Sequence, residues 1–261
     1  MPENARLSER PAPIDRLLAV MAKLRDPDGG CEWDLAQNFS TIAPYTIEEA
    51  YEVADAIASA DPAAICDELG DLLLQVVFHS QIATDEGLFG FDDVATAISD
   101  KMERRHPHIF GDTATDDVRG QWEAIKAAER ARDGSHSALE GVALSLPALL
   151  RSQKLQSRAA RVGFDWPDAE GPRAKIIEEL AEVAAAPTDD ARAEEIGDLL
   201  FAVVNYARHL GVDAEGALRA ANEKFTRRFR AVEDRAGPDI ANLSLDTLEA
   251  HWQAVKASER S

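Results

Sequence analysis

Cysteine is scarce in this chain of 261 residues, with Cys31 and Cys66 as the only two. They lie far apart in the sequence and form no paired-cysteine motif, which excludes a disulfide framework and a cysteine-based zinc site. So few thiols are typical of a protein kept in a reducing compartment, and we therefore expect a cytoplasmic location.

Long apolar runs are also missing. The longest, over residues 69–78, is interrupted by Gly70, Asp71 and Gln75 and is too short to cross a bilayer. The first 13 residues contain no apolar segment of the secretory type. We therefore expect no secretory signal and no membrane partner.

Basic residues are outnumbered, since 28 Lys and Arg face 48 Asp and Glu and the net charge is -20. Such a field repels nucleic-acid polymers and anionic membrane surfaces. A small phosphate ligand is not excluded, because a few basic side chains beside a divalent ion can hold it locally. The charge therefore argues against a nucleic-acid polymer as a partner.

Strand signals are rare, whereas helical periodicity recurs throughout the chain. Helices are expected over about 14–24, 46–59, 63–85, 91–105 and 118–132, and then over about 146–162, 174–185, 191–210, 213–233 and 245–258. Thr46 is expected to cap the second of these, with Glu49 three residues later as in a capping box. The pattern predicts an all-α fold of helix bundles with antiparallel neighbours.

The sequence does contain one ordered set of residues written twice. The first copy reads EEAYE at 48–52, ELGD at 68–71, KMERR at 101–105 and WEAIK at 122–126. The second reads EELAE at 178–182, EIGD at 195–198, KFTRR at 224–228 and WQAVK at 252–256. This order predicts a tandem duplication with domains at 12–133 and 134–261, joined by a linker at 134–137. A repeat of this length is a duplicated domain and not a solenoid.

The repeated acids are spaced to meet. Glu49 and Glu52 are three residues apart and share a helix face, as do Glu68 and Asp71 on the next helix. An antiparallel hairpin brings the two pairs together. Two like charges about 4 Å apart cost roughly 4 kcal/mol at an effective dielectric of 20. Either the carboxyl pKa values rise or a cation joins them.

Ligands that are all oxygen select a hard ion, so Mg²⁺ is the predicted cofactor, with Mn²⁺ as a substitute. The predicted metal ligands are Glu49, Glu52, Glu68 and Asp71 in the first copy and Glu179, Glu182, Glu195 and Asp198 in the second. The alternative is a solvated acidic face. Asp198 is followed directly by Leu199, however, and ionisable groups that close to core positions need a partner.

The basic blocks are suited to phosphate. Lys224 and Arg228 share a helix face, and an ammonium with a guanidinium matches a triphosphate tail. The candidate substrate-binding residues are Asn222, Lys224, Arg227, Arg228 and Trp252, together with Lys101, Arg104, Arg105 and Trp122. The basic blocks could equally be solvated faces that balance helix dipoles, and the tryptophans could be core residues. Trp33, Phe164 and Trp166 are expected to anchor the core or loops.

The acidic motif, EExxE followed by a spacer and ExxD, resembles that of the all-α nucleoside triphosphate pyrophosphohydrolases. From about Ile14 to Lys256 the chain resembles their two-repeat type, the MazG family. Further stretches that carry the resemblance are GCEWD at 30–34, RRHPH at 104–108, HSAL at 136–139 and VGFDW at 162–166. The spacer has 15 residues in the first copy and 12 in the second, counted over 53–67 and 183–194.

The resemblance implies Mg²⁺-dependent hydrolysis of canonical and non-canonical nucleoside triphosphates to monophosphate and pyrophosphate by a homodimer. It also implies nucleotide-pool housekeeping and a role in stress survival. Transferred by motif, residues from Lys175 to Glu179 line the nucleotide pocket, Asp198 contacts substrate as well as metal, Lys224 to Arg228 hold the phosphates, and Trp252 contacts the nucleotide. The second repeat is the better supported catalytic site in this family, although both motifs are complete here.

Glu178, Glu179, Lys224 and Arg228 are the predicted catalytic residues. Glu178 is a candidate base because it adjoins Glu179 but points about 100° away around the helix. The sequence leaves two alternative functions open. One is a narrower activity of the dUTPase-like or phosphoribosyl-ATP pyrophosphohydrolase kind. The other is a helical module that senses nucleotides without turnover.

Overall fold

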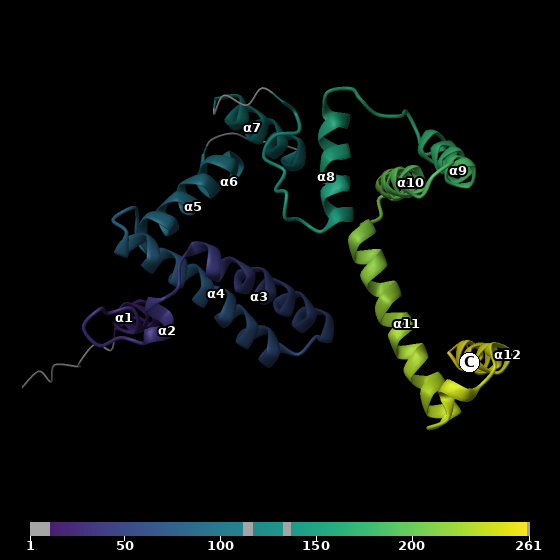
Figure 1. Ribbon diagram of the computed structural model, residues 1–261. Helices are drawn as coiled ribbons and strands as arrows, with labels where there is room; N and C mark the ends of the chain where they lie inside the picture. The colour runs from purple at the N-terminus through teal and green to yellow at the C-terminus, as the bar shows by residue number, and fades with distance from the viewer. Residues whose placement is uncertain (1–10, 112–116, 133–136, 260–261) are drawn as a thin grey trace, which may run out of the picture. The chain divides into compact units, whose positions relative to one another are not determined.

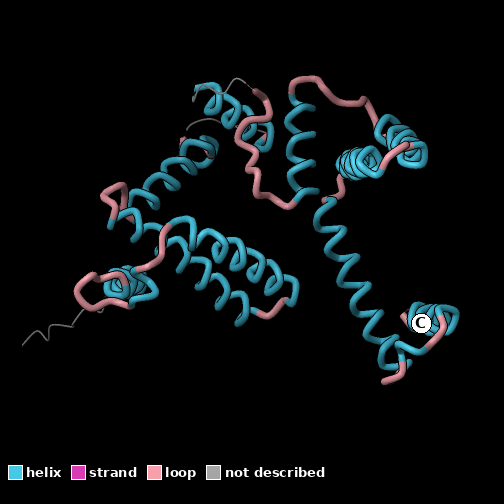
Figure 2. The backbone as a smooth tube through the Cα atoms, viewed as in Figure 1, coloured by secondary structure: helices cyan, strands magenta, loops and turns pink. Residues whose placement is uncertain are grey.

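The computed structural model describes residues 11–111, 117–132 and 137–259. Within these ranges the chain is all-α and contains no strand (Figure 2). It divides into two compact units, Met1–Ala128 and Glu129–Ser261. The boundary lies inside α7 (Val118–Arg132), and the predicted linker at 134–137 is outside the described residues except for Ser137.

Unit 1 is built on a hairpin of α3 (Phe39–Ser59) and α4 (Pro62–Asp85), which lie side by side (Figure 1). α1 (Pro13–Leu24) and α5 (Phe91–Arg105) pack against α4. The short helices α2 (Glu32–Leu35) and α6 (Pro107–Phe110) were not expected from the sequence. Helix α4 therefore packs against three other helices of this unit.

The predicted cap at Thr46 is wrong, because α3 begins seven residues earlier. The side chain of Asn38 accepts hydrogen bonds from the amides of Ser40 and Thr41, and the Thr41 hydroxyl accepts one from the Asn38 amide. This capping box outweighs Pro44, which removes only one helical hydrogen bond. Thr46 therefore lies inside the helix, where its hydroxyl contacts His79 Nε2 at 3.0 Å.

A tight turn joins α3 to α4. Ala60 adopts the left-handed conformation with φ 56°, and Asp61 then caps α4 by accepting from the Ala63 amide. Pro62 follows at the first helical position, where its missing N–H costs nothing. These residues return the chain antiparallel, which places Glu68 opposite the acids of α3.

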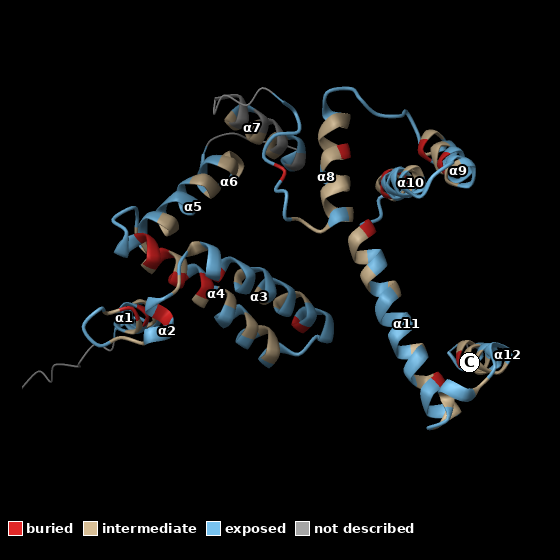
Figure 3. Ribbon diagram, in the orientation of Figure 1, coloured by how far each residue is buried: buried red, intermediate tan, exposed pale blue. Residues whose placement is uncertain are grey.

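The core of unit 1 gathers around the C-terminal half of α4 (Figure 3). Its buried members are Met21, Ile42, Val77, Phe78 and Ile82. The part of the hairpin nearer the turn is different, because Leu69 and Leu73 are exposed. The acidic motif lies on this less buried half of the hairpin.

Unit 2 repeats the hairpin as α9 (Glu170–Ala185) and α10 (Asp189–His209), with α8 (Ala148–Arg161) packed on α10. α11 (Ala214–Ala236) packs mainly on α12 (Leu245–Ser258) and also touches α8 and α10. A 3₁₀ turn, η1 (Ile240–Asn242), lies between α11 and α12. Helix α9 begins four residues before the expected start, since Gly171 and Pro172 are tolerated in a first turn.

No helix among the described residues is long and apolar enough to cross a membrane.

Candidate functional site

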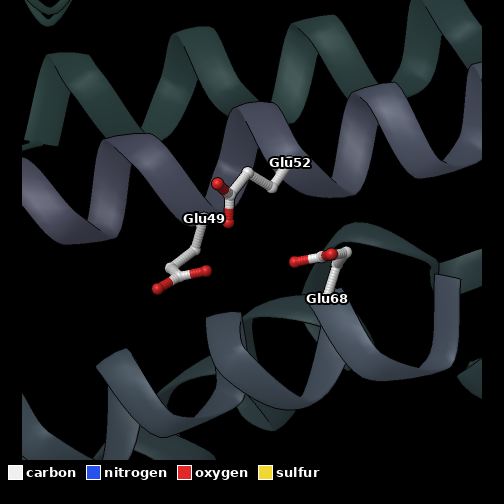
Figure 4. A group of neighbouring side chains, drawn as sticks. All are labelled: Glu49, Glu52 and Glu68. Carbon is white, nitrogen blue, oxygen red and sulfur yellow. The ribbon is translucent and has the colours of Figure 1, made fainter. Parts of the chain in front are cut away.

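The acids of unit 1 meet between the two arms of the α3–α4 hairpin. Glu49 and Glu52 extend from α3 and Glu68 from α4, and their carboxylates point into the same space (Figure 4). One oxygen from each lies within 4.8 Å of the others. Burial raises the pKa of Glu49, and the charges of Asp71 and Glu52 raise it further. Asp71 is outside the group of three but acts on it electrostatically.

Unit 2 forms the same cluster from Glu179 and Glu182 on α9 and Glu195 on α10. Glu179 is only 2% exposed, and its Oε2 is buried without a hydrogen-bond partner among the described residues. Its Oε1 lies 2.5 Å from Lys175 Nζ, which also donates to Glu178 at 2.9 Å. A buried carboxylate therefore has one oxygen neutralised and the other available.

The electrostatics of this cluster favour an additional cation. Burial raises the pKa of Glu182, and the neighbouring Glu179 carboxyl raises it further through a hydrogen bond and its charge. Hydrogen bonds to Glu179 and Glu178 raise the pKa of Lys175, so the lysine stays charged. One ammonium does not balance three carboxylates. The all-oxygen donors and the free Glu179 Oε2 fit a hard divalent ion.

A cavity of about 270 Å³ opens beside the unit 2 acids. Its lining includes Lys175, Glu179 and Asp198, together with apolar wall from Phe201 and the amide of Asn205. Asp198 is not in the group of three carboxylates but faces this cavity. The cavity therefore presents negative charge, one ammonium and apolar surface to the same small volume.

Trp166 lines this cavity from the loop that precedes α9. A Cβ at Gly171 would overlap its indole ring, so glycine at this position allows the ring to lie against the first turn of α9. Phe164, expected as an anchor, is 81% exposed, which makes a core role wrong for this residue. Trp33 is half exposed, with its ring edge-on to Tyr45 and Phe78.

The basic block of unit 2 has its described contacts with α12. Arg228 donates to Glu259 from Nε at 2.8 Å and from Nη2 at 2.6 Å, and its guanidinium lies 5.9 Å from the ring centroid of Trp252. Arg227 lies 3.6 Å from the same carboxylate. Asn222 and Lys224 are exposed on α11. The structure does not pair these residues with the acids, so their role toward phosphate stays a prediction.

The corresponding block of unit 1 lies at the end of α5. Lys101 and Arg105 are half-buried, and Arg104 donates to the carbonyl of Asp100. Trp122 packs edge-on to His106 at 5.0 Å, and its Nε1 is buried without a partner among the described residues. Trp122 is thus packed within its unit, in agreement with the core interpretation.

Sequence reasoning missed several neighbours of the acids. Gln75 donates to Glu49 at 3.3 Å, and Phe201 and Asn205 line the cavity of unit 2. A helical register gives a signal for Gln75 and Phe201, since they follow Asp71 and Asp198 at spacings of four and three. Asn205 also shares this helix face, at a spacing of seven from Asp198, but the repeat gives no signal for it because Phe78 stands at its position in the first copy.

These features define a class: all-α proteins in which a duplicated helical hairpin collects carboxylates from both arms. The chain belongs to the MazG family, because the MazG nucleotide pyrophosphohydrolase domain matches residues 37–110 and 170–232. Both matched segments include the acidic hairpins.

Named relatives agree with this assignment over nearly the whole chain. The nucleoside triphosphate pyrophosphohydrolase of Escherichia coli K12 is 53% identical over 94% of this chain and 98% of its own length. The nucleoside triphosphate pyrophosphohydrolase/pyrophosphatase MazG of Thermotoga maritima is 42% identical over 95% of this chain and 97% of its own length. The nucleoside triphosphate pyrophosphohydrolase of Mycobacterium tuberculosis is 32% identical over 97% of this chain and 72% of its own length.

Proposed function

We propose that this chain hydrolyses nucleoside triphosphates to nucleoside monophosphate and pyrophosphate, with unit 2 as the active site. The observation that carries the proposal is Glu179: a buried carboxylate with an unpartnered oxygen, beside two further carboxylates and a cavity. The names of the relatives support the choice of substrate. Such an activity would serve the maintenance of the nucleotide pool.

Glu179, Glu182, Glu195 and Asp198 would hold Mg²⁺, or Mn²⁺ in its place. When bound, the ion supplies charge neutralisation and a water of lowered pKa. Lys175 holds the Glu179 carboxylate in place through its 2.5 Å ion pair. Glu178 is exposed and accepts a hydrogen bond from Lys175, the lysine that also pairs with Glu179. It is our candidate to accept a proton from the attacking water. Lys224 and Arg228 would bind the phosphates once Arg228 leaves Glu259.

We also propose that the protein works as a homodimer in the cytoplasm. Large apolar side chains are exposed on the α9–α10 hairpin: Ile177, Leu180, Ile196, Leu200 and Val203. Apolar surface of this extent on neighbouring helices is typical of a protein interface. The free thiol of exposed Cys66 supports a reducing location. Light scattering should give the mass of two chains, and the mass of one chain would contradict the dimer.

The activity is tested by incubating the protein with ATP and Mg²⁺ and identifying the products by ion-exchange chromatography. AMP and pyrophosphate are expected, and chelation by EDTA should abolish both. ADP with orthophosphate would contradict the proposal. A panel that adds dUTP and phosphoribosyl-ATP separates general hydrolysis from the narrower activities. Mg²⁺-dependent nucleotide binding without any product would instead identify a sensor.

A further inference from the structure

A second cavity of unit 2, of about 330 Å³, adjoins the one beside Glu179. Trp166, Phe201 and Asn205 line both, so the two cavities are adjacent compartments along the same side chains. Its size is at the lower end of the range for small-molecule sites, about 300–1,000 Å³. A ligand with a charged part and a flat apolar part could therefore occupy both cavities.

The walls of the second cavity are mainly apolar. They include Leu139, Leu155 and Ala159, with Phe164 and Phe201 supplying aromatic rings. Phe164 is 81% exposed although it is a large apolar residue, so its ring is available at the cavity. An aromatic ring beside an apolar cavity can stack on a flat heteroaromatic ligand, whatever the identity of that ligand.

One side-chain oxygen in the wall of this cavity has no hydrogen-bond partner in the described part of the chain. Gln156 is 6% exposed, and its Nε2 donates to the carbonyl of Phe201 at 2.8 Å. Its Oε1 is buried without a hydrogen-bond partner among the described residues. Because buried acceptors are normally satisfied, this oxygen is the kind of group that a ligand N–H completes.

Another part of the wall is joined by hydrogen bonds and an ion pair. Asn205 Oδ1 accepts from Arg208 Nε at 3.0 Å and Nη2 at 2.7 Å, and Arg208 Nη2 lies 2.5 Å from Asp165. The amide of Asn205 is thereby fixed at the junction of the two cavities. A wall of this kind can position a ligand without reorganising when the ligand binds.

We propose that the second cavity binds the nucleobase of the substrate, with the base stacked on Phe164 and one of its N–H groups donated to Gln156 Oε1. The identity of the ligand as a nucleotide rests on the proposed function. The phosphates would then extend into the first cavity, toward Glu179 and Asp198. Gln156 thereby favours a base that presents an N–H at the position facing Oε1 over an analogue that lacks this N–H.

The test compares ATP with purine riboside triphosphate, which differs only by lacking the 6-amino group. Wild-type protein should prefer ATP in kcat/KM by about ten-fold to a hundred-fold, since a buried acceptor is left unpaired by the analogue. Gln156→Met should bring the ratio close to one. Phe164→Ala should weaken both nucleotides and keep the ratio. Gln81→Met, the same change on the surface of unit 1, should behave as wild type.

Binding of the same two nucleotides is measured by calorimetry with Ca²⁺ in place of Mg²⁺, and circular dichroism checks the fold of each variant. An unchanged ratio in folded Gln156→Met overturns the proposal and leaves hydrolysis standing. Should Gln156→Met not fold, Phe164→Ala decides, because wild-type ATP affinity in that variant overturns the pocket. A wild-type protein that distinguishes the two nucleotides through Gln156 but releases no pyrophosphate upholds the pocket and overturns the proposed function. No binding of either nucleotide overturns the pocket.

Discussion

Glu49 in unit 1 and Glu179 in unit 2 hold the same position in the repeated hairpin, yet their surroundings differ. Glu49 is half-buried and accepts a neutral hydrogen bond from Gln75, whereas Glu179 is sealed from solvent and paired with an ammonium. The repeat places Tyr45 where unit 2 has Lys175. A phenol cannot balance a buried carboxylate as a lysine can, so the unit 1 acids have no such counter-charge four residues before the motif.

The second difference is one of volume. Asn205, which lines both cavities of unit 2, corresponds to Phe78 in unit 1. Phe78 is 4% exposed and packed in the core, with the Trp33 ring edge-on at 6.3 Å and the Arg25 guanidinium at 5.6 Å. Both copies thus keep the acidic residues, while Phe78 fills space in unit 1 and Asn205 leaves it open to a ligand in unit 2.

The largest expected effect is on turnover. Glu179→Gln should lower the rate of pyrophosphate release from ATP about a thousand-fold, because the metal ion it helps to hold supplies several kcal/mol of charge stabilisation. Glu49→Gln should change the rate less than two-fold if the unit 1 acids take no part in the reaction. A coupled pyrophosphate assay at saturating Mg²⁺ measures both.

The matched pair of substitutions makes this comparison direct, since each removes the same charge from the same place in its hairpin. Equal losses in the two variants would show that both units contribute to turnover. A full rate in Glu179→Gln would remove unit 2 from the mechanism. Circular dichroism of both variants shows whether either has lost its fold, which would lower the rate for an unrelated reason.

The next effect is on stability. Phe78→Ala should cost about 3–5 kcal/mol of unfolding free energy, because it opens a cavity in a packed core. Asn205→Ala should cost only about 1–2 kcal/mol, the value of the hydrogen bonds that Asn205 accepts from Arg208. Urea unfolding followed by circular dichroism measures both. A larger loss of unfolding free energy for Asn205→Ala would show that Asn205 is a core residue of unit 2, as Phe78 is of unit 1.

Much of the fold was accessible from the sequence, because long helices with strong periodicity fix their own ends through caps and prolines. The expected ranges 91–105, 118–132 and 245–258 agree with α5, α7 and α12. The error at Thr46 arose from a local signal: a plausible capping box was outcompeted by another at Asn38. Short elements such as α2 and α6 have too few residues to show a period.

Only the charged residues of the candidate site could be predicted from the sequence. Spacing alone placed Glu179, Glu182 and Glu195 together, since helix geometry dictates which side chains share a face. The two cavities were not predictable. The walls of the first come from α9, α10 and a loop, those of the second come from α8, α10 and loops, and both depend on how these elements pack. The partner of Arg228 was also not predictable, as Glu259 lies outside the repeated blocks.

A third prediction concerns the metal ion, and it compares the affinities of the two acidic clusters. Mg²⁺ at about a hundred times its dissociation constant should stabilise the protein by about 2.7 kcal/mol, because only the folded hairpin gathers the carboxylates. Glu179→Gln should reduce this gain more than Glu49→Gln, since among the described residues of the two clusters only Glu179 is a sealed carboxylate with an unpartnered oxygen. Thermal unfolding against Mg²⁺ concentration measures the gain. Equal reductions would show that the two clusters bind the ion alike.

The smallest expected effect comes from an ion pair that unit 2 has and unit 1 lacks at the matching place, where Glu32 and Gln81 stand. The Arg208 guanidinium beside Asp165 lowers the pKa of that carboxyl to about 2 from an ordinary 3.8. A lowered pKa stabilises the fold above about pH 4 and ceases to do so as the pH falls toward 2. Asp165→Asn should therefore lower the free energy of unfolding by about 1 kcal/mol at pH 7, as for an ion pair near the surface, and this difference from wild type should shrink toward zero in acid. Urea unfolding at pH 7, 5, 4 and 3 measures the difference, with Glu32→Gln as the unit 1 control. A difference that stays constant down to pH 3 and below would mean that Asp165 stabilises unit 2 by packing and not by charge.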